Sequence, residues 1–171
     1  HHFFEERFAR EGMGLAGVTL SPFKAWIDDW VFTGNNKLTK LMIKSNGENF
    51  SYNLELQTHY SPILQGENGF SIKSAKGNAS HYYSQPFYTV VGWVEIDGHK
   101  EKVKGQGWLD REWSSDLLGE TQVGWDWFSI HLGSGNKLML FQVRDESGNN
   151  FVSGSWINKN GKKEVLSEKK V

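Results

Sequence analysis

The sequence alternates between short runs of strand length and clusters of turn-forming residues. Turn signals rich in Gly, Asn, Asp and Ser recur at residues 45–49, 65–69, 76–80, 97–99, 133–136, 146–150 and 158–162. The clearest run between them is FSYNLELQ, in which Phe50, Tyr52, Leu54 and Leu56 alternate with polar residues. Because successive side chains of a β-strand point to opposite faces, this run predicts a half-buried strand over residues 50–57.

The same criteria predict strands along most of the chain. Beside 50–57, the expected strands are 38–44, 69–73, 83–96, 101–109, 124–132, 137–144 and 151–157. Residues 3–12 are the one segment in which we expect a helix. Strands that follow one another through tight turns predict an antiparallel all-β fold. Closure would remove exposed edges, so we expect an up-and-down β-barrel, with a β-sandwich as the alternative.

Composition excludes several classes of function. The 171 residues are near the usual size of one domain, and 19 basic against 20 acidic residues give a formal net charge of −1. We therefore expect no nucleic-acid partner. No run approaches the roughly 18 apolar residues of a membrane-spanning helix, so no integral membrane segment is expected. The absence of cysteine excludes disulfides, thiolate metal sites and cysteine nucleophiles.

The segment GQGWLDREW places acidic side chains among tryptophans at residues 105–113. If the segment is a strand, Trp108 and Asp110 share one face. A carboxyl group that loses contact with water favours its neutral form, and a neutral carboxyl group can act as a general acid. The alternative is structural, with Asp110 paired to Arg111, Arg144 or turn amides at the end of the barrel.

His81 is a second candidate, because it opens the aromatic run HYYSQPFYTVVGW directly after a turn. Tyr83 is expected on the same face of this strand. A histidine there could act as a base or position a water molecule. The alternative is a surface histidine at the start of a strand.

The run GWDWFSIHL at residues 124–132 is apolar on both alternating faces, so we expect both to be covered. Trp125 and Trp127 would share one face, whereas Asp126 would lie on the other and need a hydrogen-bond donor if buried. These residues are candidates for a binding site. The alternative is that the tryptophans belong to the core.

Five segments carry a resemblance to a known family: ERFAREGMGLAG, WIDDW, ASHYYSQP, GQGWLDREWSS and GWDWFSIHL. In order and spacing they resemble the AttH-like lipocalin family, which is related to carotenoid 1,2-hydratase, also called hydroxyneurosporene synthase. The resemblance covers most of residues 3–145. It implies two consecutive lipocalin-type barrels in a secreted or periplasmic bacterial protein. The chain would then be a central fragment, with a barrel domain at 1–150, incomplete at its N-terminus, and a linker or second barrel starting at 151–171.

The resemblance also implies which residues form the site. The catalytic residues of the hydratases include an Asp with an aromatic residue two positions before it, and an upstream His with a nearby aromatic residue. Asp110, Trp108, His81 and Tyr83 occupy the matching positions. Trp108 stands where the hydratases tend to have Tyr, and Tyr83 where they tend to have Trp. These departures place the chain nearer the AttH-like branch and do not imply carotenoid as the substrate.

The expected activity is that of a hydratase (a hydro-lyase) or hydrolase acting on a small hydrophobic molecule such as an isoprenoid or lipid. Asp110 would protonate an alkene, aromatic faces would stabilise the carbocation by about 0.5–2 kcal/mol each, and His81 would orient water. This reaction needs no cofactor and no metal. The expected substrate-binding residues are Trp108, Tyr83, Trp113, Trp127, Asp126 and Glu112.

Two readings without catalysis remain open. In the first, the chain is a non-catalytic binding protein for a lipid or another apolar ligand, and Asp110 and His81 orient its polar end. In the second, the barrel is structural and side chains fill its lumen.

Overall fold

A computed structural model describes residues 2–115 and 118–167, and all regular secondary structure in these ranges is β-strand. The strands are β1 (Ala16–Leu20), β2 (Phe23–Ile27), β3 (Trp30–Gly34), β4 (Lys40–Asn46), β5 (Phe50–Gln57), β6 (Ile63–Leu64), β7 (Phe70–Ile72), β8 (Ala79–Ile96), β9 (His99–Trp113), β10 (Gln122–His131), β11 (Lys137–Asp145), β12 (Phe151–Ile157) and β13 (Lys163–Ser167). The helix expected at residues 3–12 is not formed. No helix in the described ranges could cross a membrane.

The strands are distributed over two compact units. His1–Ser61 and Phe87–Gly107 make up the first unit, and Pro62–Pro86 and Trp108–Val171 the second, as far as these residues are described. The long strands β8 and β9 contribute one part to each unit.

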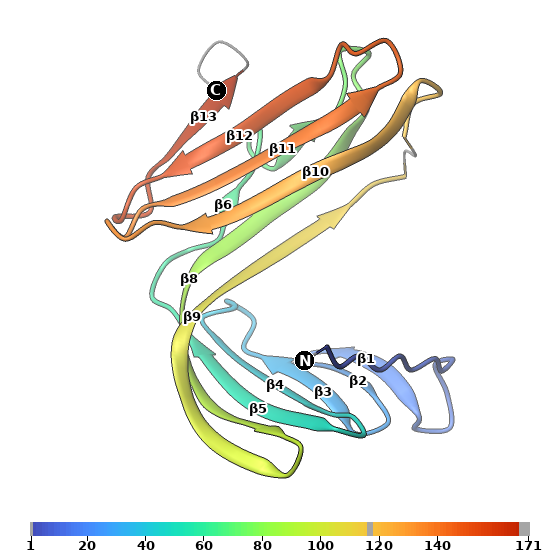
Figure 1. The fold of residues 1–171 in the computed structure, drawn as a ribbon, viewed down its shortest axis with the longest axis vertical. Coiled ribbons are helices and arrows are strands. Elements are labelled where there is room, and N and C mark those ends of the chain that lie inside the picture. Colours follow the sequence, from blue (N-terminus) through green and yellow to red (C-terminus); the bar gives the residue numbers. More distant parts are fainter. Residues whose placement is uncertain (1, 116–117, 168–171) are drawn as a thin grey trace. The chain divides into compact units, whose positions relative to one another are not determined.

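The first unit is an antiparallel meander. Strands β1 to β5 pair in sequence order, β5 pairs with the C-terminal part of β8, and β9 pairs with β8 (Figure 1). The β8–β9 hairpin turns at Asp97 and Gly98, whose φ angles of 49° and 77° suit a tight two-residue turn. The buried residues Leu41, Leu56 and Tyr88 form part of its core.

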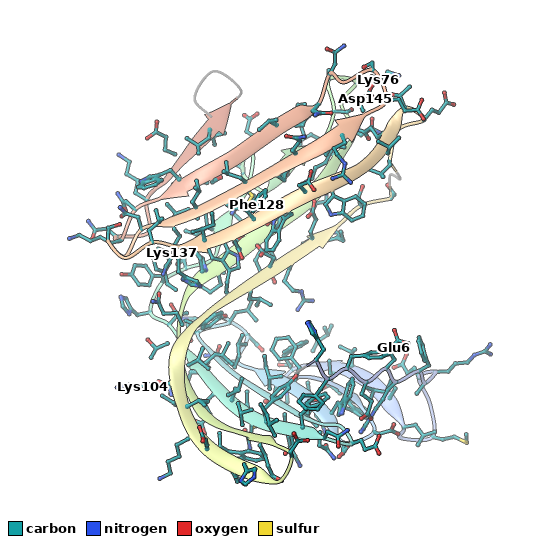
Figure 2. The ribbon with its side chains drawn as sticks, viewed as in Figure 1. Glu6, Lys76, Lys104, Phe128, Lys137 and Asp145 are labelled. Carbon is teal, nitrogen blue, oxygen red and sulfur yellow. The ribbon has the colours of Figure 1, made fainter. Side chains whose placement is uncertain are left out.

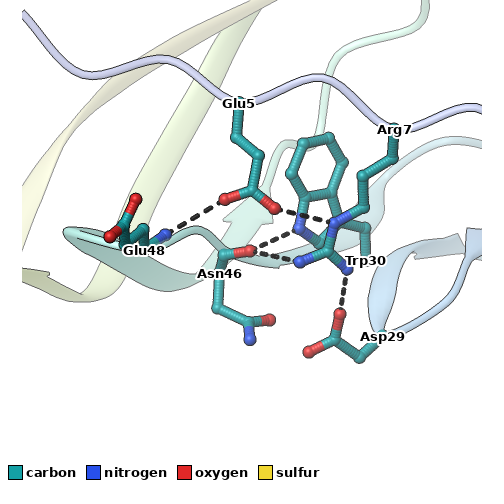
Figure 3. A network of polar contacts seen from close by, with 6 residues as sticks. All are labelled: Glu5, Arg7, Asp29, Trp30, Asn46 and Glu48. Atoms are coloured by element: carbon teal, nitrogen blue, oxygen red, sulfur yellow. Dashed lines mark hydrogen bonds and ion pairs between the residues drawn. The ribbon is translucent and has the colours of Figure 1, made fainter.

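Polar contacts fix the irregular N-terminal segment against the first unit (Figure 3). The Arg7 guanidinium donates to the side chains of Asp29 and Glu5, and to the carbonyl oxygen of Asn46 at 2.8 Å. It also lies 4.5 Å from the ring centroid of Trp30, whose Nε1 donates to the same carbonyl at 2.6 Å. These contacts hold the segment without intrasegment helix hydrogen bonds.

The second unit contains two sheets whose inner faces share one core. Strands β6 and β7 pair with the N-terminal part of β8, and β10 to β13 form a separate antiparallel meander. Tyr82 of β8 is buried with Met139, Phe141 and Val143 of β11, and Trp108 of β9 packs against this cluster. This face-to-face arrangement is that of a sandwich.

The structure confirms the all-β, antiparallel class. Among the described residues neither sheet closes into a barrel, so the second unit matches the sandwich alternative. Each strand expected from the sequence is present, whereas the short strands β1, β2, β3, β6 and β13 were not predicted. The domain boundary expected at residue 150 stays a prediction. Strands β11 and β12, which flank it, are neighbours in one sheet.

Both faces of β10 were expected to be covered, and this expectation is wrong. Trp125 and Phe128, on opposite faces, are 61% and 52% exposed. The reason is that β10 is the end strand of its sheet, with β11 as its partner. Phe128 is labelled on this strand in Figure 2.

Candidate functional site

Alternation along β8 directs a row of hydroxyl groups toward two carboxyl groups of β9. Tyr82 and Ser84 both donate to Oδ1 of Asp110, at 2.9 Å and 2.5 Å. Ser80 donates to Oε1 of Glu112 at 2.5 Å. Since residues two apart in a strand share a face, these three residues of β8 face Asp110 and Glu112 inside the second unit.

Asp110 is also the end point of a buried chain of hydrogen bonds. The Ser155 hydroxyl donates to Oε1 of Gln65 at 2.7 Å, and Nε2 of Gln65 donates to the Ser84 hydroxyl at 2.8 Å. Ser155, Gln65 and Ser84 are each 0% exposed. Each hydrogen bond in this series is donated in the direction of Asp110. The buried polar groups therefore satisfy one another, and Oδ1 of Asp110 is the final acceptor.

Tyr82 links Asp110 to the aromatic side of the site. Its hydroxyl accepts a hydrogen bond from Nε1 of Trp127 at 3.1 Å while donating to Asp110. Burial, followed by the negative charge of Asp110, raises the pKa of Tyr82 well above its usual value. The phenol therefore stays protonated and acts as a donor to the carboxyl group.

Lys73 follows β7 and forms an ion pair with Glu112, with 2.7 Å between Nζ and Oε1. The ammonium group also lies 3.9 Å from the ring centroid of Phe141 and 5.0 Å from that of Tyr82. Burial lowers the pKa of Lys73, and the charges of Glu112 and then Asp110 oppose this shift. A half-buried cation is thus held between a carboxylate and aromatic faces.

These groups line a cavity of about 910 Å³ that lies within the second unit. The polar part of its wall contains Lys73, Ser80, Asp110 and Glu112. The aromatic part consists of Tyr82, Trp113, Trp125, Trp127 and Phe141. The remaining lining residues are Asn78, Ala79, Ser114, Leu118, Gln122 and Val143. An apolar cavity of this size with a few converging polar groups is typical of a small-molecule site.

The family model for AttH-like proteins matches residues 1–171. The chain belongs to the AttH-like family. A protein of known structure from Nitrosomonas europaea, described as an AttH, matches with a TM-score of 0.79 and 32% identity over 94% of this chain. Kievitone hydratase from Nectria haematococca matches with a TM-score of 0.67 and 17% identity over 84% of this chain. The AttH-like chain spans about half of these two proteins, 51% and 45% of their lengths. No curated protein sequence matches it.

Four of the residues predicted from the sequence of this AttH-like chain lie in the cavity wall. They are Asp110, Glu112, Trp113 and Trp127. Trp108 shares the face of Asp110 but lies outside the cavity lining, packed on the core and edge-on to His131 at 5.6 Å. Its buried Nε1 has no hydrogen-bond partner among the described residues.

His81 and Tyr83 do not lie in this cavity. They alternate with Ser80, Tyr82 and Ser84 along β8 and therefore point to the opposite face. The His81 ring stacks on Trp113, which also borders the cavity, with centroids 5.7 Å apart, and Tyr83 meets Trp113 edge-on at 6.2 Å. His81 is not among the lining residues of the cavity that contains Asp110, and its catalytic role stays a prediction.

Asp126 also lies outside the cavity lining. Its side chain is 44% exposed and forms an ion pair with Arg144, with 2.6 Å between the charged groups. Asp126 alternates with Trp125 and Trp127, which face inward, so it lies on the outer face of β10.

Sequence reasoning missed Lys73, Tyr82, Ser84 and Gln65. A usable signal was the placement of Ser80 and Ser84 on either side of Tyr82, because small polar residues at alternating positions of an aromatic strand mark an inner face that must hold hydrogen bonds. The described residues contain no group of three or more His, Cys, Asp or Glu side chains that could hold a metal ion.

Proposed function

We propose that the cavity of the second unit binds an apolar, unsaturated small molecule and that Asp110 promotes the addition of water to its double bond. The observation that carries this proposal is the position of Asp110, between a buried chain of hydroxyl donors and an aromatic-lined cavity. The fold shared with kievitone hydratase supports water addition as the reaction to test.

In the proposed first step, the fraction of Asp110 that carries a proton transfers it to one alkene carbon. Tyr82 and Ser84 both donate to Oδ1, so the transferable proton lies on Oδ2. As the carboxylate forms, these two hydrogen bonds become charge-assisted and strengthen. Interactions that strengthen as charge develops lower the barrier rather than only binding substrate.

The second step adds water to the carbocation. The faces of Trp125 and Trp127, which line the cavity, each stabilise the cation by about 0.5–2 kcal/mol without forming a bond to it. The water oxygen then bonds to the cationic carbon, and one water proton passes to Oδ2 of the Asp110 carboxylate, whose Oδ1 Tyr82 and Ser84 hold. The substrate thereby gains one water molecule and the enzyme is unchanged.

The experiment detects the transfer of hydrogen from water to a substrate carbon, so the product need not be known in advance. The chain is incubated in heavy water with unsaturated isoprenoid alcohols and hydrocarbons, and deuterium bound to carbon is measured by mass spectrometry. We expect incorporation with the unmodified chain and its loss in Asp110→Asn, with thermal unfolding used to verify the fold. Asp97→Asn, at the exposed β8–β9 turn, is the matched control and should behave like the unmodified chain. Incorporation by Asp110→Asn at the unmodified rate would contradict the proposed role.

Non-catalytic binding of an apolar ligand is the second candidate. The position of His81 favours it, because the residue expected to orient water lies on the opposite face from Asp110. Tight binding in the cavity with no deuterium incorporation by the unmodified chain would support this function over hydration.

A further inference from the structure

The ion pair of Lys73 and Glu112 offers a donor and an acceptor side by side in the cavity wall. Lys73 and Ser80 both contact Oε1 of Glu112. The Glu112 side chain is 38% exposed and that of Lys73 is 20% exposed, so ligand atoms can reach both groups. An ammonium group has three donors and a carboxylate accepts through two oxygens, so one contact between them does not exhaust either group.

The charges around this pair select the kind of ligand group that fits. An anionic group would approach Lys73 but would also meet the carboxyl groups of Glu112 and Asp110. A cationic group would meet Lys73 itself. A neutral hydroxyl group can accept a hydrogen bond from Lys73 and donate one to Glu112 at the same time, leaving no buried polar atom without a partner.

We infer that the Lys73–Glu112 pair binds a hydroxyl group of the ligand, which makes the substrate class an unsaturated alcohol with an otherwise apolar skeleton. The double bond must lie next to Asp110, which protonates it in the proposed reaction. This inference therefore rests on the proposed function. Asp110 and Glu112 are two residues apart on one face of β9, which separates them by about 7 Å. The hydroxyl group and the double bond of the substrate should be separated by a similar distance.

The aromatic wall supplies the surface for the apolar skeleton. Trp125 and Trp127 are 61% and 42% exposed although they lie on the inner face of β10. A skeleton that extends from Asp110 toward these rings would cover them. Covering these large apolar side chains removes apolar surface from water and therefore favours binding.

Calorimetric titration of three related molecules into the full chain tests the inference. Geraniol carries the hydroxyl group, geranic acid carries a carboxylate in its place, and myrcene is a hydrocarbon. We expect geraniol to bind about tenfold more tightly than myrcene, the gain that one hydrogen bond to a charged group provides. Geranic acid should bind less tightly than geraniol.

Replacing both members of the pair, Lys73→Met with Glu112→Gln, leaves no buried charge without a partner and should remove the advantage of geraniol over myrcene. Lys104→Met, at an exposed position of β9 in the first unit, is the control and should retain it. The inference is overturned if geraniol does not bind, if myrcene or geranic acid binds as tightly to the unmodified chain, or if the double variant keeps the preference. A preference for geraniol without deuterium incorporation would leave the inference standing and refute the proposed hydration.

Discussion

At the scale of single residues, the site depends on a tyrosine that joins its polar and aromatic parts. The hydroxyl of Tyr82 is at once a donor to Asp110 and the acceptor for Trp127, and the residue is 2% exposed. Tyr83, the next residue, has its ring on the outer face against Trp113. Two adjacent tyrosines therefore have different physical roles, because one faces the cavity and the other does not.

Tyr82→Phe should lower the free energy of unfolding by about 1–3 kcal/mol, since it leaves Nε1 of Trp127 without its acceptor and removes one of the two donors to Asp110. Tyr83→Phe removes a hydroxyl on the outer face and should change this free energy by less than about 0.5 kcal/mol. Urea unfolding of both variants provides the comparison. Equal effects of the two substitutions would show that the Tyr82 hydroxyl is not held as described.

Asp145 makes stability depend on pH. A hydrogen bond from the Ser147 side chain, then one from Thr121, lowers the pKa of Asp145 from 3.8 to about 2, and Lys76 adds to the shift (Figure 2). Because the folded pKa is below the unfolded one, ionised Asp145 stabilises the fold above pH 3.8, and this contribution is lost as pH falls through about 2.

The variant Asp145→Asn should therefore be less stable than the unmodified chain at neutral pH. The difference should shrink as the pH is lowered from 3.8 toward 2. Urea unfolding across this range measures it, and a difference that does not change with pH would exclude the ionised carboxylate as its source.

Asp110 was identifiable from sequence because the spacing from Trp108 is local and strand alternation alone puts both residues on one face. Its partners were not identifiable in the same way. Ser84, Gln65 and Ser155 come from different parts of the chain, and the pairing of strands brings them together. Lys73 likewise meets Glu112 only after folding.

Among the strands, close packing between neighbours limits the size of the side chains that fit in β12. A Cβ atom at Gly154 would collide with the carbonyl oxygen of Met139 and come within 2.5 Å of the Leu140 side chain. At Gly105 in β9, a Cβ atom would meet no other atom within 4 Å among the described residues. The two glycines are therefore a matched pair for testing the packing around β11 and β12.

Gly154→Ala should destabilise the fold by about 1–3 kcal/mol, because the added methyl group displaces backbone in a packed sheet. Gly105→Ala should be neutral or slightly stabilising. Thermal unfolding of both variants measures the difference. A neutral Gly154→Ala would mean that β12 does not approach β11 as closely as described.

Strand positions were largely predictable because alternation and turn residues are local signals, as in residues 50–57. In contrast, the sequence does not predict which face of β8 points inward. Sequence alone groups His81 with Tyr83 and Ser80 with Tyr82 and Ser84, but either group could face inward, since moving a strand by one residue exchanges its faces. Packing of Tyr82 against Met139, Phe141 and Val143 of β11 selects the group of Tyr82.

At the scale of the whole molecule, each compact unit has its own cavity. A cavity of the first unit is about 730 Å³ and is lined by aromatic residues that include Trp26, Trp30 and Phe50. The cavity of the second unit is about 910 Å³ and contains Asp110 at the end of the buried hydrogen-bond chain. The two cavities are similar in size. The assignment of function to the second unit therefore rests on Asp110 and its hydrogen-bond partners.

Hydrogen–deuterium exchange with and without geraniol tests that assignment most directly. We predict slower amide exchange in residues 79–86, 108–114 and 122–131, which surround Asp110, and no change in residues 23–34 of the first unit. Slower exchange confined to residues 23–34 would contradict it and move the ligand site to the other cavity.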